Sequence, residues 1–550
     1  MLAAVIAVGV AARWAPPVPG ALVVAACAVA LCLRRPPFLV VLLVVIVGWR
    51  AHHELAALDD TALGPISGTA VLHRDPSRVG PGRVTVDATV GARRYLLSAS
   101  PPAAGLLDDL SAGTEVRITG RVSKFGERRD WSQARHLAGV LTVDEVGAVR
   151  GRGRLWDVAD RFRAPLLRGA EVLKGSTRAI YEGLVLGDDR GQRDLDRHRF
   201  RASGLSHLLV VSGENVAFVL VAVQPLLLRL GLRQRWLATI VILMVFGTAV
   251  RWEPSVVRAV AMAGVAATAT WGGRRSAGIR SWSLAIGSLI LIDPLIMRSA
   301  GFMLSAAATL GLVVMARPIA DRLPGPRLVA EPVAVAIAAH LGVAPLLVVM
   351  FGVVPAAGLV VNLLAVPLAG WIMVWGLTAG LVAGLVAGSG LWWPAQVLHV
   401  PTTLMVSGVE QLAEWGSRPG LPMLGAVHVA ALVGFGAVWW WTSTTAGRRL
   451  RLVLGSMVTA GVLVIGLLAA RPPGPMTERV DAGSWFRVEA DGRTSVYVGG
   501  LASGEDLAGA LSARRVKRID LVVLTSSGPT ASGVARLLAE VWPVAAVRPP

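Results

Sequence analysis

Residues 183–220 read GLVLGDDRGQRDLDRHRFRASGLSHLLVVSGENVAFVL, and this stretch organises the rest of the chain. Its first half is charged, its second half is apolar, and polar residues interrupt the apolar half. We call these residues the polar cluster: His207, Ser212, Gly213, Glu214 and Asn215. Ionisable and amide groups are costly at membrane depth, so they usually face a partner, a cavity or a conduit. A Ser-Gly pair can also break a helix, which a bilayer tolerates only where the freed backbone faces protein or water.

The composition indicates a polytopic α-helical membrane protein. Of the 550 residues, 54% are hydrophobic and 16% are charged, with a mean hydropathy of +0.61, whereas soluble domains average about 25% charged residues. The formal net charge is +19. A basic excess suits an anionic partner such as nucleic acid or lipid headgroups, but the arginines that anchor cytoplasmic loops produce the same excess and account for the larger share. Cys27 and Cys32 share one apolar segment and indicate neither a metal site nor a disulfide.

Residues 1–50 are apolar with two polar interruptions, and they predict two or three transmembrane spans. We do not interpret the first apolar piece as a signal peptide, because no small-residue cleavage site follows it. Arg34 and Arg35 are expected on the cytoplasmic side, which places the residues after Arg50 outside.

Residues 60–150 alternate between polar and apolar side chains, with Gly, Pro and Asp between the runs. This pattern is typical of a small antiparallel β domain. Five such strands fit a partly open barrel of the OB type, a fold that often binds single-stranded nucleic acid. Stacking aromatics are few and the charge is mixed, so a purely structural barrel fits the sequence at least as well.

Residues 154–181 predict one basic amphipathic helix at the membrane surface, with a plain connecting helix as the alternative. Residues 183–470 form the main transmembrane region, and 392–415 is predicted to be re-entrant or interfacial. The predicted spans within this region are 205–230, 236–250, 255–271, 282–297, 301–316, 329–351, 353–369, 371–389, 422–441 and 452–470. Residues 476–550 return to alternation in a strand–helix–strand order, which predicts the start of an α/β fold.

Six short motifs follow one another through the main transmembrane region. They are GLVLGD (183–188), FRASGLSHLLVVSGENVA (200–217), PSVVRAVAM (254–262), DP (293–294), GFMLSAAATLGLV (301–313) and NLLAVPL (362–368). Each motif alone is weak, but together and in this order they resemble the ComEC/Rec2 competence family, whose members form the inner-membrane DNA channel of natural transformation. The passage FGERRDW (125–131) in the β domain is similar to the family's N-terminal OB-like domain.

The sequence departs from the family in two places. Many relatives carry a His where Asn215 stands, which removes that group from any proton or metal chemistry. The tail resembles the family's metallo-β-lactamase-like domain, but LVVLTSSGPTASG (521–533) replaces the metal motif. The ligand positions carry Ser526, Gly528, Thr530 and Ala531. Hydroxyl or absent side chains cannot supply imidazole and carboxylate ligands, so we expect a degenerate, truncated, metal-free remnant without hydrolase activity.

Seven residues are predicted to line the DNA path: the polar cluster, Arg258 and Asn362. Arg258 lies within an apolar span and is the best candidate for a charge that faces phosphate. Glu214 is expected to pair with Arg251 or Arg258, or to be solvated if it lies near the interface. His207 fits a conduit or a packed helix contact equally well, Ser212 and Gly213 also suit an ordinary helix contact, and Asn362 suits a hydrogen bond between helices.

The acidic residues near the start of the main region resemble a metal cluster at first sight, but arginines are interleaved with them, so we expect a solvated, salt-bridged loop. They are Asp188, Asp189, Asp194 and Asp196.

The sequence thus predicts a multi-pass protein of the cytoplasmic membrane that conducts single-stranded DNA and catalyses no reaction. No GxxxxGK[ST] nucleotide-binding loop is present and no cofactor is expected. The resemblance implies a DNA receptor and a cytoplasmic helicase-type motor as partners beside the lipid bilayer, and leaves a homo-oligomer open. Two alternatives remain at this stage: a transporter of another anionic solute, such as a nucleotide or lipid headgroup, and a membrane-tethered metal-dependent phosphodiesterase, which the missing ligands disfavour.

Overall fold

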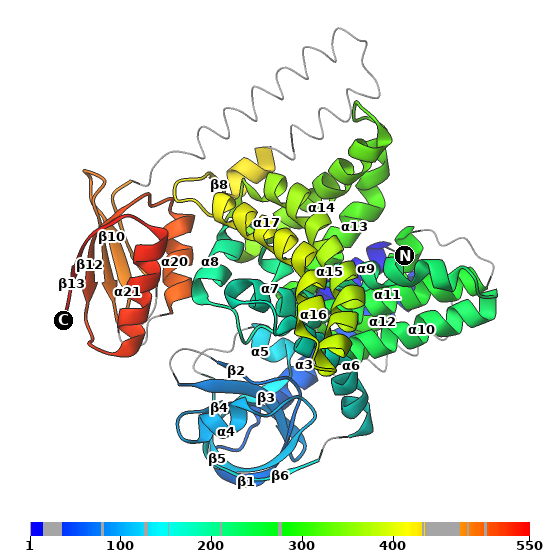
Figure 1. Cartoon of the computed structure of the whole chain (residues 1–550), viewed down its shortest axis with the longest axis horizontal. Coiled ribbons are helices and arrows are strands. Elements are labelled where there is room, and N and C mark those ends of the chain that lie inside the picture. The colour runs from blue at the N-terminus through cyan, green and yellow to red at the C-terminus, as the bar shows by residue number, and fades with distance from the viewer. Residues whose placement is uncertain are drawn as a thin grey trace.

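A computed structural model describes most of the chain (Figure 1). The described residues are 2–14, 36–78, 82–125, 130–151, 153–209, 212–252, 254–272, 278–431, 434, 474–480, 483–499 and 503–550. The chain is mostly helical, with one β region near the N-terminus and a second near the C-terminus (Figure 1). Five described helices are long and apolar enough to cross a membrane: Val40–Asp59, Leu232–Ala249, Ala300–Ala320, Val329–Phe351 and Gly358–Gly388.

The N-terminal β region is a closed barrel. Its strands are β1 (Gly64–Leu72), β2 (Ser77–Arg78), β3 (Val84–Val90), β4 (Arg93–Ala99), β5 (Glu115–Ser123) and β6 (Leu137–Arg150). The sheet order is β1-β5-β6-β4-β3-β2, and a further pairing of β1 with β3 closes it. The pairings are antiparallel except for β4 with β6, which is parallel. Alternate side chains point inward, and Leu72, Leu97, Ile118 and Leu141 are at most 1% exposed.

Helices α1 (Leu2–Trp14) and α3 (Pro36–Asp59) precede the barrel. Within it, α4 (Ala103–Asp108) and α5 (Asp130–Ala134) are short. The central part contains the following helices: α6 (Arg154–Ala170), α7 (Gly175–Leu186), α8 (Asp194–Ala202), η1 (Ser206–Leu208), α9 (Gly213–Leu227), α10 (Leu232–Ala249), α11 (Pro254–Trp271), α12 (Gly278–Ile292), η2 (Pro294–Arg298), α13 (Ala300–Ala320), α14 (Arg327–Phe351), α15 (Gly358–Gly388), α16 (Trp392–Leu398) and α17 (Val400–Gly416). A two-stranded ladder joins β7 (Val354–Pro355) to β8 (Met423–Leu424).

Several predicted boundaries are wrong. The predicted spans 353–369 and 371–389 form the single helix α15, because Pro367 is accommodated inside it. The predicted span 205–230 is interrupted between η1 and α9. The region 392–415 consists of the two helices α16 and α17. Most of 422–441 and all of 452–470 lie outside the described residues.

The predicted surface helix 154–181 is two helices, α6 and α7, separated near Gly175, whose φ of 55° suits a glycine. Both pack against α15 rather than lying free at the surface. The contact is close because glycines of α15 face them: a Cβ on Gly384 would lie 1.7 Å from the Pro165 carbonyl oxygen, and one on Gly380 would lie 2.3 Å from the Tyr181 hydroxyl. The Tyr181 hydroxyl donates a hydrogen bond to the Gly376 carbonyl at 2.9 Å.

The C-terminal region is a mixed sheet, covered on one face by two helices. Its strands and helices are β9 (Met476–Arg479), β10 (Trp485–Val488), β11 (Thr494–Val498), α20 (Gly504–Ala513), β12 (Ile519–Leu524), α21 (Pro529–Val541) and β13 (Val544–Arg548). The order is β13-β12-β11-β10-β9, with β9, β10 and β11 antiparallel and β11, β12 and β13 parallel. We call it the tail sheet. Phe486, Val496 and Val522 on its inner face are buried with Leu507 and Leu538 from the helices.

Candidate functional site

The start of α9 holds most of the polar cluster. Ser212 is the N-cap residue, and its hydroxyl accepts a hydrogen bond from the Glu214 backbone N–H at 3.2 Å. The Asn215 side chain is 5% exposed and donates to the Leu184 carbonyl of α7 at 2.8 Å, while the Ser212 hydroxyl donates to Asn215 Oδ1 at 3.3 Å. These bonds fix the direction of α9 and hold its first turn against α7. The Ser-Gly pair therefore lies where a helix begins, just inside the apolar run.

Arg258 of α11 lies directly against this helix start. Its side chain is 4% exposed, and a Cβ on Gly213 would lie 2.1 Å from Arg258 Nη2. Only glycine leaves that space. The Nε and Nη1 atoms of Arg258 are buried, and neither has a hydrogen-bond partner among the described residues. A buried guanidinium thus faces the positive end of a helix dipole, and both groups attract an anion.

Glu214 does not make the ion pair expected of it. No ion pair joins Glu214 to Arg251 or Arg258 in the described part of the chain. Arg251 instead pairs with Asp75 at 3.2 Å and with Asp160 at 3.0 Å. The prediction is wrong for Arg251 because the barrel, folded from a distant part of the sequence, supplies Asp75. Glu214 itself is half-buried.

His207 and Asn362 belong to a second polar group. His207 in η1 is exposed, although its neighbours Leu205 and Leu208 are buried. Asn362 of α15 is 8% exposed, its Nδ2 lies 3.5 Å from Nε2 of His340, and its Oδ1 has no partner among the described residues. His340 of α14 lies close enough to His207 for their charges to interact. Sequence reasoning missed His340, although a lone His in the apolar run 329–351 was a signal.

A buried ionic network centred on Arg163 was also missed. Arg163 of α6 is 3% exposed and donates to the carbonyls of Leu186 at 2.8 Å and Ala249 at 2.7 Å, at the ends of α7 and α10. Its guanidinium lies 3.5 Å from Asp75 of the barrel and 3.6 Å from Asp188. Burial lowers the pKa of Arg163. These contacts join the barrel to the helical part.

The charged loop before α8 is salt-bridged as predicted, but only part of it is solvated. Asp188 and Asp196 are 6% and 4% exposed and pair with Arg190 and Arg193 respectively, whereas the side chain of Asp194 is exposed. Burial alone would raise the pKa of the Asp188 carboxyl, but Arg190 and Arg163 outweigh it and hold that pKa below its usual range.

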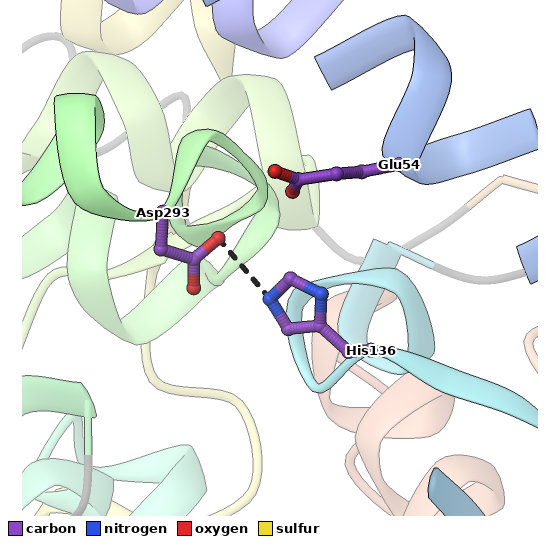
Figure 2. Close-up of side chains that lie close together, drawn as sticks. All are labelled: Glu54, His136 and Asp293. Carbon is purple, nitrogen blue, oxygen red and sulfur yellow. Dashed lines mark ion pairs between the residues drawn. The ribbon is translucent and has the colours of Figure 1, made fainter. Parts of the chain in front are cut away.

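A second loop of the barrel docks beside η2 (Figure 2). His136 Nε2 lies 3.1 Å from Asp293 Oδ1, and Arg298 lies 3.2 Å from Asp130. Glu54 of α3 points toward the same place, and one ligand atom each from Glu54, His136 and Asp293 lie within 4.8 Å of one another. These donors could hold a divalent ion, but Arg50 lies 3.2 Å from Glu54 and already supplies positive charge there.

The tail sheet docks on α8 through its helices. Glu505 of α20 lies 3.7 Å from both Arg197 and Arg201 of α8. The ring of His198 lies 5.5 Å from that of Trp542. In the loop that follows β12, the Thr525 hydroxyl donates to the Val498 carbonyl at 3.0 Å, and the Ser526 hydroxyl accepts from the Gly528 N–H at 3.3 Å. These hydroxyls serve the local backbone.

Comparison with known proteins gives one family match. The family model described as "Competence protein" matches residues 184–443. The match includes the start of α9, Arg258, His340 and Asn362, and it excludes the barrel and the tail sheet. No curated protein and no solved structure matches the chain significantly.

Proposed function

Because this chain belongs to the ComEC/Rec2-type competence family, we propose that it forms a channel through which single-stranded DNA crosses the cytoplasmic membrane in natural transformation. The family match supports a role in competence and DNA uptake, and the apolar helices support a multi-pass membrane protein. We also propose that the strand passes through the helical part and enters from outside.

The guanidinium of Arg258, two of whose nitrogens have no hydrogen-bond partner among the described residues, carries this proposal. A buried charge without a partner is strongly unfavourable, so an anion that binds beside the guanidinium is stabilised there. A phosphate group at the start of α9 would receive hydrogen bonds from the guanidinium and face the positive end of the helix. Because a polyanion presents one phosphate after another, the same group serves each nucleotide in turn. His207, Glu214 and Asn362 would supply polar surface along the path.

The mechanism is passage without catalysis. Ser212 and Asn215 have hydrogen-bonding roles at the helix start that orient α9. A guanidinium that offsets phosphate desolvation lowers the barrier to entry but supplies no direction. The driving force must therefore come from a nucleotide-driven partner such as the helicase-type motor that the family implies.

The barrel is proposed as a scaffold of the OB type. Its closed order of five long strands with one parallel pair supports that fold. OB folds bind nucleic acid with the loop between their first two strands and the loop between their last two. Here the first of these loops supplies Asp75 to Arg163, and the second supplies Asp130 and His136 to η2. Both loops are engaged with the helical part, which favours the structural interpretation.

Both soluble regions are proposed to lie on the outer face. Asp188 contacts the barrel through Arg163, while Arg197 and Arg201 contact the tail. The segment between them is a loop and a charged helix, far shorter than the roughly 20 residues of a span. The barrel and the tail sheet therefore share one side of the membrane. The tail sheet is proposed to be a metal-free remnant, since its replaced ligand positions carry no zinc donors.

Deleting the gene tests the proposed DNA uptake directly, and the entry of labelled DNA into the cytoplasm is measured after transformation. Label should no longer reach the cytoplasm, and unchanged entry would overturn the proposal.

Arg258→Ala should lower uptake about tenfold or more, because a hydrogen bond to a charged group is lost. It should leave thermal unfolding in detergent unchanged or raise its midpoint, because an unpaired buried charge is removed. Arg258→Lys keeps the charge without the planar fork and should recover part of the uptake.

Arg233→Ala is the matched control, since Arg233 is an exposed arginine of the neighbouring α10. It should leave uptake unchanged. Wild-type uptake by Arg258→Ala, at normal membrane levels, would contradict the role of Arg258.

Transport into liposomes that contain the purified protein separates the two transport functions. If the liposomes take up nucleotides but no oligonucleotide, the protein is a transporter of small anionic solutes and the channel proposal is wrong.

A further inference from the structure

One face of the tail sheet is covered and the other is open. Helices α20 and α21 pack on the inner face, and they lie between the sheet and α8 (Figure 1). The outer face points away from the helical part (Figure 1). Side chains alternate between the two faces, so the pairing register identifies the outer set.

The outer face carries a stacked aromatic pair at its centre. Trp485 of β10 pairs with Tyr497 of β11, and their rings stack with centroids 3.8 Å apart and planes 7° apart. Both side chains are half-buried, so part of each is accessible. The pair thus gives this face accessible aromatic surface, with Arg479 and Val523 as its cross-strand neighbours on either side.

Arginines surround this pair across the sheet. Arg479 pairs with Trp485 in register, Arg487 follows on the same strand, and Arg548 pairs with Val523, which pairs with Tyr497. All three arginines are exposed. Beyond Arg487 on the same face lies Glu489, an exposed carboxylate at the end of the β10–β11 hairpin. The face therefore combines aromatic surface with an excess of positive charge.

We infer that the outer face of the tail sheet is a binding site for single-stranded nucleic acid. Bases stack on the accessible surface of Trp485 and Tyr497, and phosphates pair with Arg487 and Arg548. Every base has a flat π surface, so this recognition tolerates any sequence. The site rests on the proposed function, and deepens it by giving the strand an outer contact that the docked loops of the barrel do not offer.

Binding of a labelled oligothymidylate to the full-length protein in detergent tests the inference, with fluorescence anisotropy as the readout. Trp485→Ala should weaken binding roughly 5- to 100-fold, the usual effect of losing one stacking side chain. Arg487→Gln should also weaken it and should lower the slope of log K against log salt by about 0.7, the value for one phosphate on a single strand. Arg536→Gln is the matched control, because Arg536 is an exposed arginine on α21, on the opposite side of the sheet.

Wild-type affinity and salt slope in both Trp485→Leu and Arg487→Gln would overturn the inference; the leucine variant keeps apolar surface if the alanine variant fails to fold. If light scattering shows a dimer that Trp485→Leu dissociates without loss of oligonucleotide binding, the face joins two copies of the chain and the inference is wrong. Failure here leaves the channel intact if gene deletion still blocks uptake. Binding through this face with normal uptake in the deletion strain would instead overturn the channel alone.

Discussion

The barrel and the tail sheet lie against neighbouring parts of the same segment, yet they use different surfaces. The barrel inserts two polar loops, and their contact includes the nearly inaccessible Arg163 and Asp188. The tail contributes helix side chains, and its ion pairs through Glu505 are partly exposed at 3.7 Å. Removing one partner from a group of buried, mutually dependent charges is costly, because it leaves the others buried without compensation. Removing one charge from an exposed ion pair costs little.

This difference bears on function. Two loops of the barrel are engaged with the helical part, and these are the loops that would be offered to nucleic acid if the barrel is of the proposed OB type. The tail sheet docks through its helices, and its outer sheet face points away from the helical part. Our proposals therefore assign the barrel a scaffold role and the outer face of the tail sheet the contact with a strand.

The largest effect is expected from removing the centre of the barrel contact. Arg163→Met leaves Asp75 and Asp188 without this buried partner and leaves two helix-end carbonyls without their donor. Breaking a buried ion pair costs about 3–5 kcal/mol. Hydrogen exchange should become faster in peptides that contain Asp75 or Asp188. Arg161→Met, an exposed change two residues away on α6, should alter neither peptide. Unchanged exchange in Arg163→Met would show that other contacts hold the barrel.

A smaller and pH-dependent effect is expected at the tail. Burial, followed by the nearby charges of Arg201 and Arg199, lowers the pKa of His198 to about 4. The undocked ring has an ordinary pKa of about 6.5, so protonation favours the undocked state once the pH falls below that value. Docking is therefore complete above about pH 6.5 and loses about 1.4 kcal/mol per pH unit down to about pH 4. Glu505 and Asp506 are the carboxylates of α20 that pair with arginines of this helix.

Energy transfer between dyes on Asp194→Cys of α8 and Ser532→Cys of α21 measures this docking, in a background with Cys27 and Cys32 replaced by alanine. Transfer should fall on acidification in the protein with His198. His198→Phe retains a ring against Trp542 and has no proton to gain, so its transfer should stay level over the same range. A parallel fall in both proteins would assign the effect to other groups.

The sequence was sufficient for local features and insufficient for long-range partners. Alternation predicted both β regions, and the polar residues after Leu209 predicted a break where α9 begins. The same patterns could not predict which charged residues form ion pairs, because Asp75 and Arg163 are brought together only when the barrel folds. That is why Arg251 was expected to pair with Glu214, and why the loop at Asp188 was expected to be solvated.

Arg258 shows both what the sequence could predict and what it could not. Its position inside an apolar span was enough to identify it as a candidate functional residue. That it lies against Gly213, with two nitrogens that have no partner in the described part of the chain, depends on how α9 and α11 cross. Helix crossing is decided by the packing of many small side chains and has no short-range signature.

The smallest effect is expected from the exposed ion pairs of the tail. Glu505→Gln removes the carboxylate that lies 3.7 Å from Arg197 and Arg201. Pairs of this kind contribute about 0–1 kcal/mol and weaken further as salt is added. The same dye pair should therefore report a loss of docking of at most about fivefold at low salt, and almost none at high salt. If Glu505→Gln released the tail completely at high salt, the docking would depend on this carboxylate rather than on packing around His198 and Trp542, and the contrast with the barrel would no longer hold.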